Sequence, residues 1–164
     1  MADRVCVIGL GRVGLPTAVS CAASGARVTG VDRDPAVRRA VLAAEPGPEP
    51  GLAEALRAAL AGGLVVADDV VPAEVTVVCV PTPLGADRRA DLGDLWAAVA
   101  AIDRVAPADG LVVIASTVPV GTTEAAAARL RGRAVACCPE RVWPGDVLRE
   151  MTDNPRIVGG VTPQ

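Results

Sequence analysis

The chain has 164 residues, the size of one ordinary domain, and 51% of them are hydrophobic, so a full core can form. The formal net charge is −3 and no basic run stands out, which argues against nucleic-acid and membrane-surface partners. We expect no signal peptide and no transmembrane helix, because no apolar stretch approaches the roughly 20 residues that a membrane span requires.

Short β-branched runs alternate with alanine-rich stretches along the whole chain. In the first half of the chain we expect strands at 4–8, 28–31, 64–67 and 75–80, helices at 12–24 and 35–44, and, before the strand at 64–67, a helix carrying Leu52, Leu56 and Leu60. The next helix carries Leu92, Leu95, Trp96, Val99 and Ile102 on one face. After it we expect strands at 111–115 and 134–138, a helix between them at 122–130, and a short last strand at 157–158. This alternation predicts a single α/β domain, with a doubly wound, mostly parallel Rossmann-like sheet.

Three glycines follow the first predicted strand directly and open the first predicted helix. Gly9, Gly11 and Gly14 form a Gly-x-Gly-x-x-Gly pattern, in which Gly9 permits a tight turn, Gly11 admits a pyrophosphate and Gly14 lets the helix approach the sheet. Asp32 ends the second strand, 18 residues after Gly14, where a carboxylate can accept both ribose hydroxyls of NAD and repel the 2′-phosphate of NADP. The adjacent Arg33 would weaken that discrimination. The alternative is that the glycines only form a turn and Asp32 only caps a helix.

Three further loops follow strand ends at the same predicted edge of the sheet. Thr82 and Thr117 are candidates to position a nicotinamide or a ribose, while Glu140 and Arg141 are candidates to face a substrate. The alternative for each loop is ordinary turn chemistry, with threonine as a cap and proline as a stiffener. The cysteines lie in apolar segments, and we interpret Cys6, Cys21, Cys79, Cys137 and Cys138 as small buried residues in a reducing cytoplasm. With no histidine and no Cys-x-x-Cys spacing, we expect no metal site.

The motifs VIGLGRVGLP, VDRD, EPGL, VPTPL, STVPVGTT and PERVWPG occur in this order. Together they resemble the N-terminal NAD-binding domain of the UDP-glucose/GDP-mannose 6-dehydrogenase family, over essentially the whole chain. The PER-x-x-PG form and a later Val-Gly-Gly look more like the branch that acts on UDP-N-acetylhexosamines, notably UDP-N-acetylmannosamine. Pro144 stands where the UDP-glucose branch typically has a further Glu.

The resemblance implies an oxidoreductase of polysaccharide biosynthesis that oxidises C6 of a UDP-sugar from alcohol to carboxylate, with NAD as cofactor and a covalent cysteine intermediate. It implies NAD contacts and a water-placing role near the reacting carbon for some residues, and substrate contacts for others. The NAD contacts are Arg12, Val13, Asp32, Thr82 and Thr117; the supporting catalytic residues are Thr117 and Glu140; the substrate contacts are Arg141 and Val142. Family members form homodimers through a central helix.

Departures from the family pattern limit what we expect of these 164 residues. Arg12 stands where the family usually has Tyr, and Val37 where a basic residue usually follows the acid, so NAD affinity is expected to be weaker than is typical. There is no lysine, and none of the five cysteines matches the nucleophile's motif. We therefore expect the catalytic Cys and Lys, the central helix and the C-terminal UDP-binding domain to be absent. The isolated chain would then bind NAD without turnover.

Three alternatives to this assignment stay open. The chain could be a fragment of a UDP-glucose 6-dehydrogenase, or a stand-alone NAD-binding module that is regulatory or complements a separate catalytic half. It could also belong to another class of NAD(P) enzyme, such as the 3-hydroxyacid dehydrogenases, although the VPTP and PERVWPG loops argue against this class.

Overall fold

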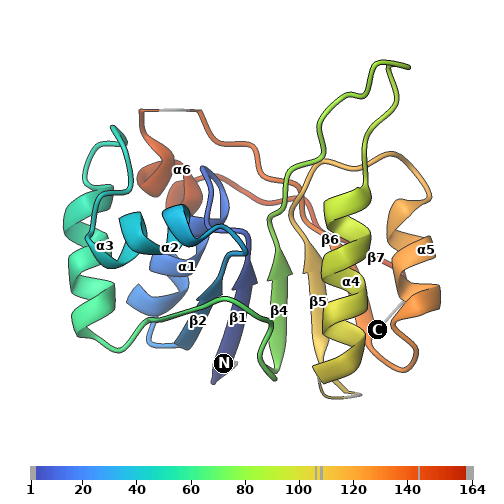
Figure 1. The fold of residues 1–164 in the computed structure, drawn as a ribbon, viewed down its shortest axis with the longest axis horizontal. Coiled ribbons are helices and arrows are strands. Elements are labelled where there is room, and N and C mark those ends of the chain that lie inside the picture. Colours follow the sequence, from blue (N-terminus) through green and yellow to red (C-terminus); the bar gives the residue numbers. More distant parts are fainter. Residues whose placement is uncertain (1–2, 106, 108, 144, 162–164) are drawn as a thin grey trace.

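A computed structural model describes residues 3–105, 107, 109–143 and 145–161, and a mixed sheet runs through the molecule (Figure 1). Among these residues the sheet has seven strands in the order β3-β2-β1-β4-β5-β6-β7. The strands are β1 (Arg4–Ile8), β2 (Arg27–Val31), β3 (Val65–Ala67), β4 (Val75–Val78), β5 (Leu111–Ile114), β6 (Ala134–Cys137) and β7 (Gly159–Gly160). All pairs are parallel except β6 with β7. The predicted mostly parallel, doubly wound sheet is therefore confirmed.

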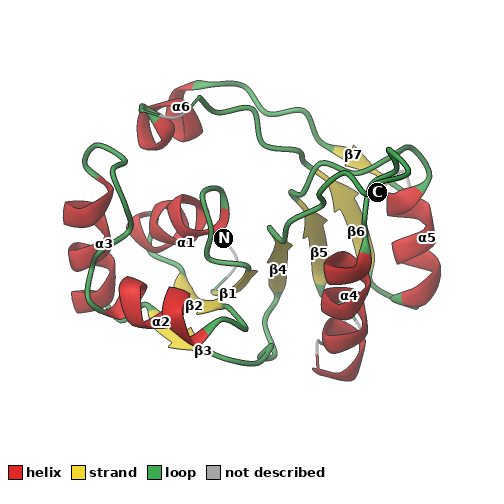
Figure 2. Cartoon of the chain, turned by 45° about the horizontal axis from the view of Figure 1, so that its top comes forward, coloured by secondary structure: helices red, strands yellow, loops and turns green. Residues whose placement is uncertain are grey.

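Helices cover both faces of the sheet (Figure 2). They are α1 (Gly14–Ala23), α2 (Pro35–Leu42), α3 (Leu52–Ala61), α4 (Gly93–Val105), α5 (Thr122–Arg129) and α6 (Val147–Asp153). The first three helices pack with the β1–β3 half of the sheet, and α4 and α5 pack on the other side over β4 to β6. No helix of the described residues has the length and apolar character needed to cross a bilayer.

Alternation along the central strand creates two hydrophobic clusters, one on each face. Cys6 and Ile8 of β1 join Leu95, Val99 and Ile102 of α4 in the first cluster. On the other face, the second cluster contains the following residues of β1, α1 and α3: Val5, Val7, Leu15, Val19, Leu52 and Leu56. Because successive strand side chains point to opposite faces, a strand buried on both faces must be apolar throughout, which is the pattern of VCVI in β1.

The strand order reverses between β1 and β4, and this reversal places the candidate residues. The chain moves from β1 outward through β2 to β3, then crosses back to β4 beside β1 and proceeds to β5 and β6. Because these strands are parallel, their carboxyl ends lie at one edge of the sheet. The loops there form a crevice at the switch point, where open α/β sheets bind ligands.

The structure corrects several expectations from the sequence. The last strand is Gly159–Gly160, not 157–158; Ile157 and Val158 are exposed, and two glycines carry no side-chain pattern that could reveal a strand. Helix α6 was not predicted, since it is only seven residues long. Cys6 and Cys138 are buried as expected, but Cys21 in α1, Cys79 directly after β4 and Cys137 at the end of β6 are partly exposed. Trp96 is half-buried against the first cluster, with the Arg129 guanidinium 3.8 Å from its ring centroid.

Candidate functional site

The turn between β1 and α1 is packed so closely that two of its glycines have no room for a side chain. Gly9 has a φ of 88° and donates its N–H to the Val31 carbonyl at 2.7 Å. A Cβ on Gly9 would lie 2.7 Å from the Cys79 carbonyl oxygen, and one on Gly14 would lie 1.7 Å from the Gly9 carbonyl oxygen. The roles predicted for Gly9 and Gly14 thus agree with the packing of this turn.

Gly11 has different surroundings, because a Cβ built there would meet nothing within 4 Å. Within the described residues, no protein acceptor lies on the backbone N–H groups of Gly11, Arg12 and Val13. These groups precede the first turn of α1, whose N-terminus carries the positive end of the helix dipole. The turn therefore offers free donors and positive potential on its open side, the requirements of a phosphate site.

Asp32 lies directly beside this turn. Its Oδ2 accepts the backbone N–H of Leu10 at 2.8 Å, and its Oδ1 accepts the N–H of Asp34 at 2.9 Å. A carboxylate has about four acceptor positions on its two oxygens, so these two bonds leave capacity for two more donors. The carboxylate is thereby fixed next to the glycine turn and can still accept a pair of hydroxyls.

The loops after β4 and β5 are joined through hydroxyl groups. Thr82 donates its hydroxyl to the Thr117 carbonyl at 2.7 Å, and the buried Ser116 donates its hydroxyl to the Val80 carbonyl at 2.7 Å. The two candidate threonines are thus brought together by the Thr82 hydroxyl and the Thr117 backbone carbonyl, and not by their two hydroxyl groups. No role for Ser116 was predicted from the sequence, although a Ser at a strand end signals such a side-chain-to-backbone bond.

A pocket of about 680 Å³ opens at this edge and is lined by residues that follow several of the parallel strands. Its lining includes these predicted site residues: Gly9, Gly11, Arg12, Val13, Asp32, Thr82, Thr117 and Glu140. Gly14 is absent from the lining because it packs beneath the turn. Residues without a predicted role also line the pocket, among them Asp68 and Asp94. Protein side chains leave the cradle open, so the residues present fit an extended dinucleotide.

Glu140 enters the pocket as one member of an ion pair. Its Oε2 lies 2.8 Å from Nη1 of Arg156, its Oε1 accepts the N–H of Arg141 at 2.9 Å, and its side chain is 9% exposed. Burial opposes the charge of Arg156, but its bonds with Glu140 and Cys138 outweigh burial and raise the pKa of Arg156. The sequence offered no pattern that links Arg156 to Glu140, since 16 residues separate them.

Cys79 lies at the floor of the pocket with a neutral thiol. Burial, followed by the nearby negative charge of Glu140, raises the pKa of Cys79 to about 12. A thiol with this pKa is protonated at neutral pH and is a poor nucleophile. Cys79 is therefore suited to packing beneath the glycine turn and not to covalent chemistry.

Arg141 and Val142 do not line this pocket. Val142 lines a second pocket of about 620 Å³ on the other side of the glycine turn, bounded by the 45–49 loop. Arg141 is exposed beside Glu150, Asn154 and Arg156. The predicted substrate residues thus lie outside the pocket that contains Asp32 and Glu140, although Val142 shares the second pocket with the predicted NAD contacts Gly11, Arg12 and Val13. Pro144, which distinguishes the family branches in sequence, lies outside the described residues.

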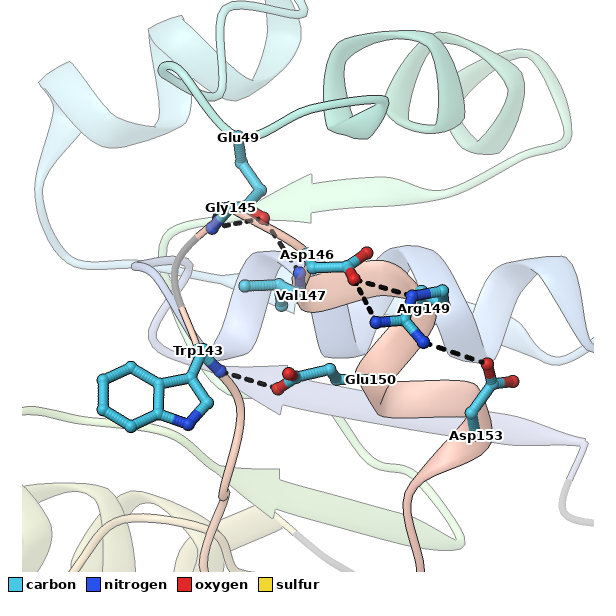
Figure 3. Close-up of polar contacts among 8 residues, drawn as sticks. All are labelled: Glu49, Trp143, Gly145, Asp146, Val147, Arg149, Glu150 and Asp153. Carbon is cyan, nitrogen blue, oxygen red and sulfur yellow. Dashed lines mark hydrogen bonds and ion pairs between the residues drawn. The ribbon is translucent and has the colours of Figure 1, made fainter.

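The segment that carries Arg141 and Val142 is fixed by a carboxylate from a distant loop. Glu49 of the EPGL motif accepts the N–H groups of Gly145 at 3.0 Å and Val147 at 2.9 Å (Figure 3). Glu150 accepts the N–H of Trp143 at 2.7 Å, which ties the loop back to α6. Glu49 thereby occupies the N-terminal end of α6 in place of a cap and sets the position of the loop.

Known proteins share both the sequence motifs and the fold of this chain. Residues 3–164 match the model of the UDP-glucose/GDP-mannose dehydrogenase family, NAD binding domain. The chain is 38% identical to a UDP-N-acetyl-D-mannosamine dehydrogenase of Methanococcus aeolicus, over 97% of this chain and 39% of that protein. It is 39% identical to an NDP-N-acetyl-D-galactosaminuronic acid dehydrogenase of Ralstonia solanacearum, over 98% of this chain and 42% of that protein.

A solved structure of a UDP-D-ManNAc dehydrogenase from Pyrococcus horikoshii superimposes with a TM-score of 0.92 at 38% identity. The match covers 96% of this chain and 41% of that one. The chain therefore spans about two-fifths of the length of the relatives that it matches. Since the family model covers residues 3–164, the chain belongs to the UDP-glucose/GDP-mannose dehydrogenase family and corresponds to its NAD-binding domain.

Proposed function

We propose that this chain supplies the cofactor domain for the NAD-dependent oxidation of the C6 alcohol of a UDP-N-acetylhexosamine, with UDP-N-acetylmannosamine favoured, to the uronic acid. The observation that carries the proposal is the pocket that the glycine turn, Asp32, the two threonine loops and Glu140 line together. NAD would supply the hydride-accepting nicotinamide for both oxidation steps.

The chain's own residues bind and orient in this proposal. The free N–H groups of Gly11, Arg12 and Val13 hold the pyrophosphate, and Asp32 accepts the adenosine ribose hydroxyls. Thr82 and Thr117, at the far side of the pocket, position the nicotinamide end. Glu140, paired with Arg156 at 2.8 Å, orients water for hydrolysis of the acyl intermediate in this proposal.

The N-acetylhexosamine assignment rests on the relatives, two of which are named for N-acetylated sugars. The PER-x-x-PG loop, fixed by Glu49, presents Arg141 and Val142 next to Glu140, where we propose that they contact the sugar nucleotide. The nucleophilic cysteine and the catalytic lysine would come from residues outside these 164, which include no lysine. The remaining parts of the site are a central helix and a UDP-binding domain in this proposal.

Calorimetric titration of the 164-residue chain with NAD+ and NADP+ tests the cofactor assignment. We expect NAD+ to bind, and Asp32→Ala to lower its affinity by about tenfold or more, because hydrogen bonds to a charged group contribute about 1.5–3 kcal/mol. Asp103→Ala is a matched control, since it removes an aspartate that lies outside the pocket. No heat of NAD+ binding to the folded wild-type chain would refute the proposal.

A turnover assay tests whether the 164 residues are a cofactor domain alone or a complete catalyst. With UDP-N-acetylmannosamine and NAD+, we expect no production of NADH by the 164 residues alone, because a positioned nucleophile and base are required. Sustained NADH formation would show that the nucleophile lies within this chain and would overturn that part of the proposal.

A further inference from the structure

The pocket contains an arginine beside the acid that is proposed to hold the adenosine ribose. Arg33 directly follows Asp32 and lines the same pocket. In dinucleotide sites, an arginine near the ribose-binding acid accommodates the 2′-phosphate of NADP. The preference between NAD and NADP would then depend on the state of Arg33 as well as on Asp32.

In this structure the Arg33 guanidinium is already bound by a carboxylate. Its Nη1 donates to Oδ1 of Asp94 at 2.7 Å and its Nη2 donates to Oδ2 at 3.0 Å, a bidentate pair. Asp94 lies in the first turn of α4, on the other half of the sheet, and also lines the pocket. The pair thus spans the mouth of the pocket from the β2–α2 turn to α4.

The neighbouring charges do not offer a replacement for Arg33. Arg38 is the next basic residue, but its Nη1 donates to the carbonyls of Asp32 and Arg33 at 2.7 and 3.0 Å, and it does not line the pocket. The other charged residues that line this pocket are Arg12, on the glycine turn, and the acids Asp32, Asp34, Asp68, Asp69 and Glu140. A dianionic phosphate at the ribose would therefore meet an acidic environment.

We infer that Asp94 is a specificity-determining residue, which engages Arg33 and so disfavours a dinucleotide with a 2′-phosphate. The inference rests on the proposed function, that this pocket binds a nicotinamide dinucleotide. Asp94 acts in two separable ways: its negative charge repels the phosphate, and its hydrogen bonds occupy the guanidinium. The side chain of Arg33 is 77% exposed and that of Asp94 is 29% exposed, and neither belongs to the hydrophobic clusters, so a substitution at Asp94 frees Arg33 without removing core packing.

A double-mutant cycle in the 164-residue chain tests the inference. The dissociation constants of NAD+ and NADP+ are measured by calorimetry for the wild type, Asp94→Ala, Arg33→Ala and the double variant. We expect Asp94→Ala to raise the affinity for NADP+ relative to NAD+ by about tenfold, equivalent to about 1.4 kcal/mol. We expect the double variant to lose most of this gain, since no guanidinium remains to bind the phosphate.

Two further variants control the cycle. Asp103→Ala removes the aspartate of another arginine pair on the same helix, Asp103 with Arg133 at 2.8 Å, and should leave the NADP+/NAD+ ratio unchanged. Asp94→Asn removes the charge but keeps an acceptor for Arg33, and should give a smaller gain than Asp94→Ala. Asp94→Asn also supplies the measurement if Asp94→Ala has a lowered melting temperature.

The outcomes distinguish the inference from the proposal on which it rests. An unchanged NADP+/NAD+ ratio in Asp94→Ala and Asp94→Asn, with NAD+ still bound, overturns the role of Asp94 alone. A gain that persists in full in the double variant overturns the role of Arg33 and reduces Asp94 to a repelling charge. A folded wild-type chain that binds neither dinucleotide refutes the proposed function itself.

Discussion

Adding one methyl group to each of two glycines in this region should affect two different properties, stability at Gly14 and NAD+ affinity at Gly11. In Gly14→Ala the new Cβ would lie 1.7 Å from the Gly9 carbonyl oxygen and 3.0 Å from the Cys79 Cβ. Both neighbours are held by the sheet, so α1 would have to move away from β1. Overpacking of this kind costs about 3 kcal/mol at the upper end of its usual range. In a domain of this size the melting temperature should then fall by about 6–12 °C.

Gly11→Ala is the matched control, because its Cβ would meet nothing within 4 Å. We expect its unfolding free energy to stay within about 0.5 kcal/mol of the wild type. Its affinity for NAD+ should nevertheless fall, because the methyl group would occupy the space through which the pyrophosphate approaches the backbone.

Thermal denaturation followed by circular dichroism measures the first effect, and calorimetric titration with NAD+ measures the second. If Gly14→Ala melted at the wild-type temperature, the close contact between the start of α1 and the Gly9 carbonyl would not exist in solution. If Gly11→Ala bound NAD+ as tightly as the wild type, the open side of the turn would not be the phosphate site.

Three other substitutions test contacts around the pocket. Glu49→Ala leaves the N–H groups of Gly145 and Val147 without their acceptor, at a cost of about 1–3 kcal/mol, so their hydrogen exchange should accelerate while that of β1 stays unchanged. Thr82→Val removes the 2.7 Å bond to the Thr117 carbonyl and should lower the melting temperature by about 2–4 °C, from a loss of about 1 kcal/mol. The pKa of Cys79 is raised from 9.0 to about 12, so the folded state holds this proton more tightly than the unfolded state. The resulting stability is fully present below pH 9 and is lost as the pH rises toward 12, so urea denaturation of Cys79→Ala should show a weaker decline between pH 8 and pH 10 than the wild type.

The elements with long, regular patterns could be predicted from the sequence, and those without such patterns could not. The helix stripe of Leu95, Val99 and Ile102 and the doubly apolar β1 indicated the sheet and its layers, because burial on one or both faces determines residue type at each position. The strand at Gly159–Gly160 gave no such indication. Its pairing with Ala136 and Cys137 depends only on backbone groups at the sheet edge.

The same difference separates the predicted parts of the site from the unpredicted ones. Gly9, Gly14 and Asp32 were found because local backbone geometry demands these residue types at fixed spacing. Arg156 and Asp94 were missed because their partners, Glu140 and Arg33, are 16 and 61 residues away. Only the folded chain brings such pairs together, since an Asp or Arg in a loop or a helix is also the ordinary residue of a solvated surface.

The two backbone bonds of Asp32 have a consequence for the affinity with which a ligand is bound. Because Leu10 and Asp34 hold both carboxylate oxygens, the side chain is in its receptive orientation before any ligand arrives. Its rotamer entropy is lost when the chain folds, so association does not include that loss again. If Asp32 holds the adenosine ribose as proposed, this end of the crevice is in this sense a preorganised receptor.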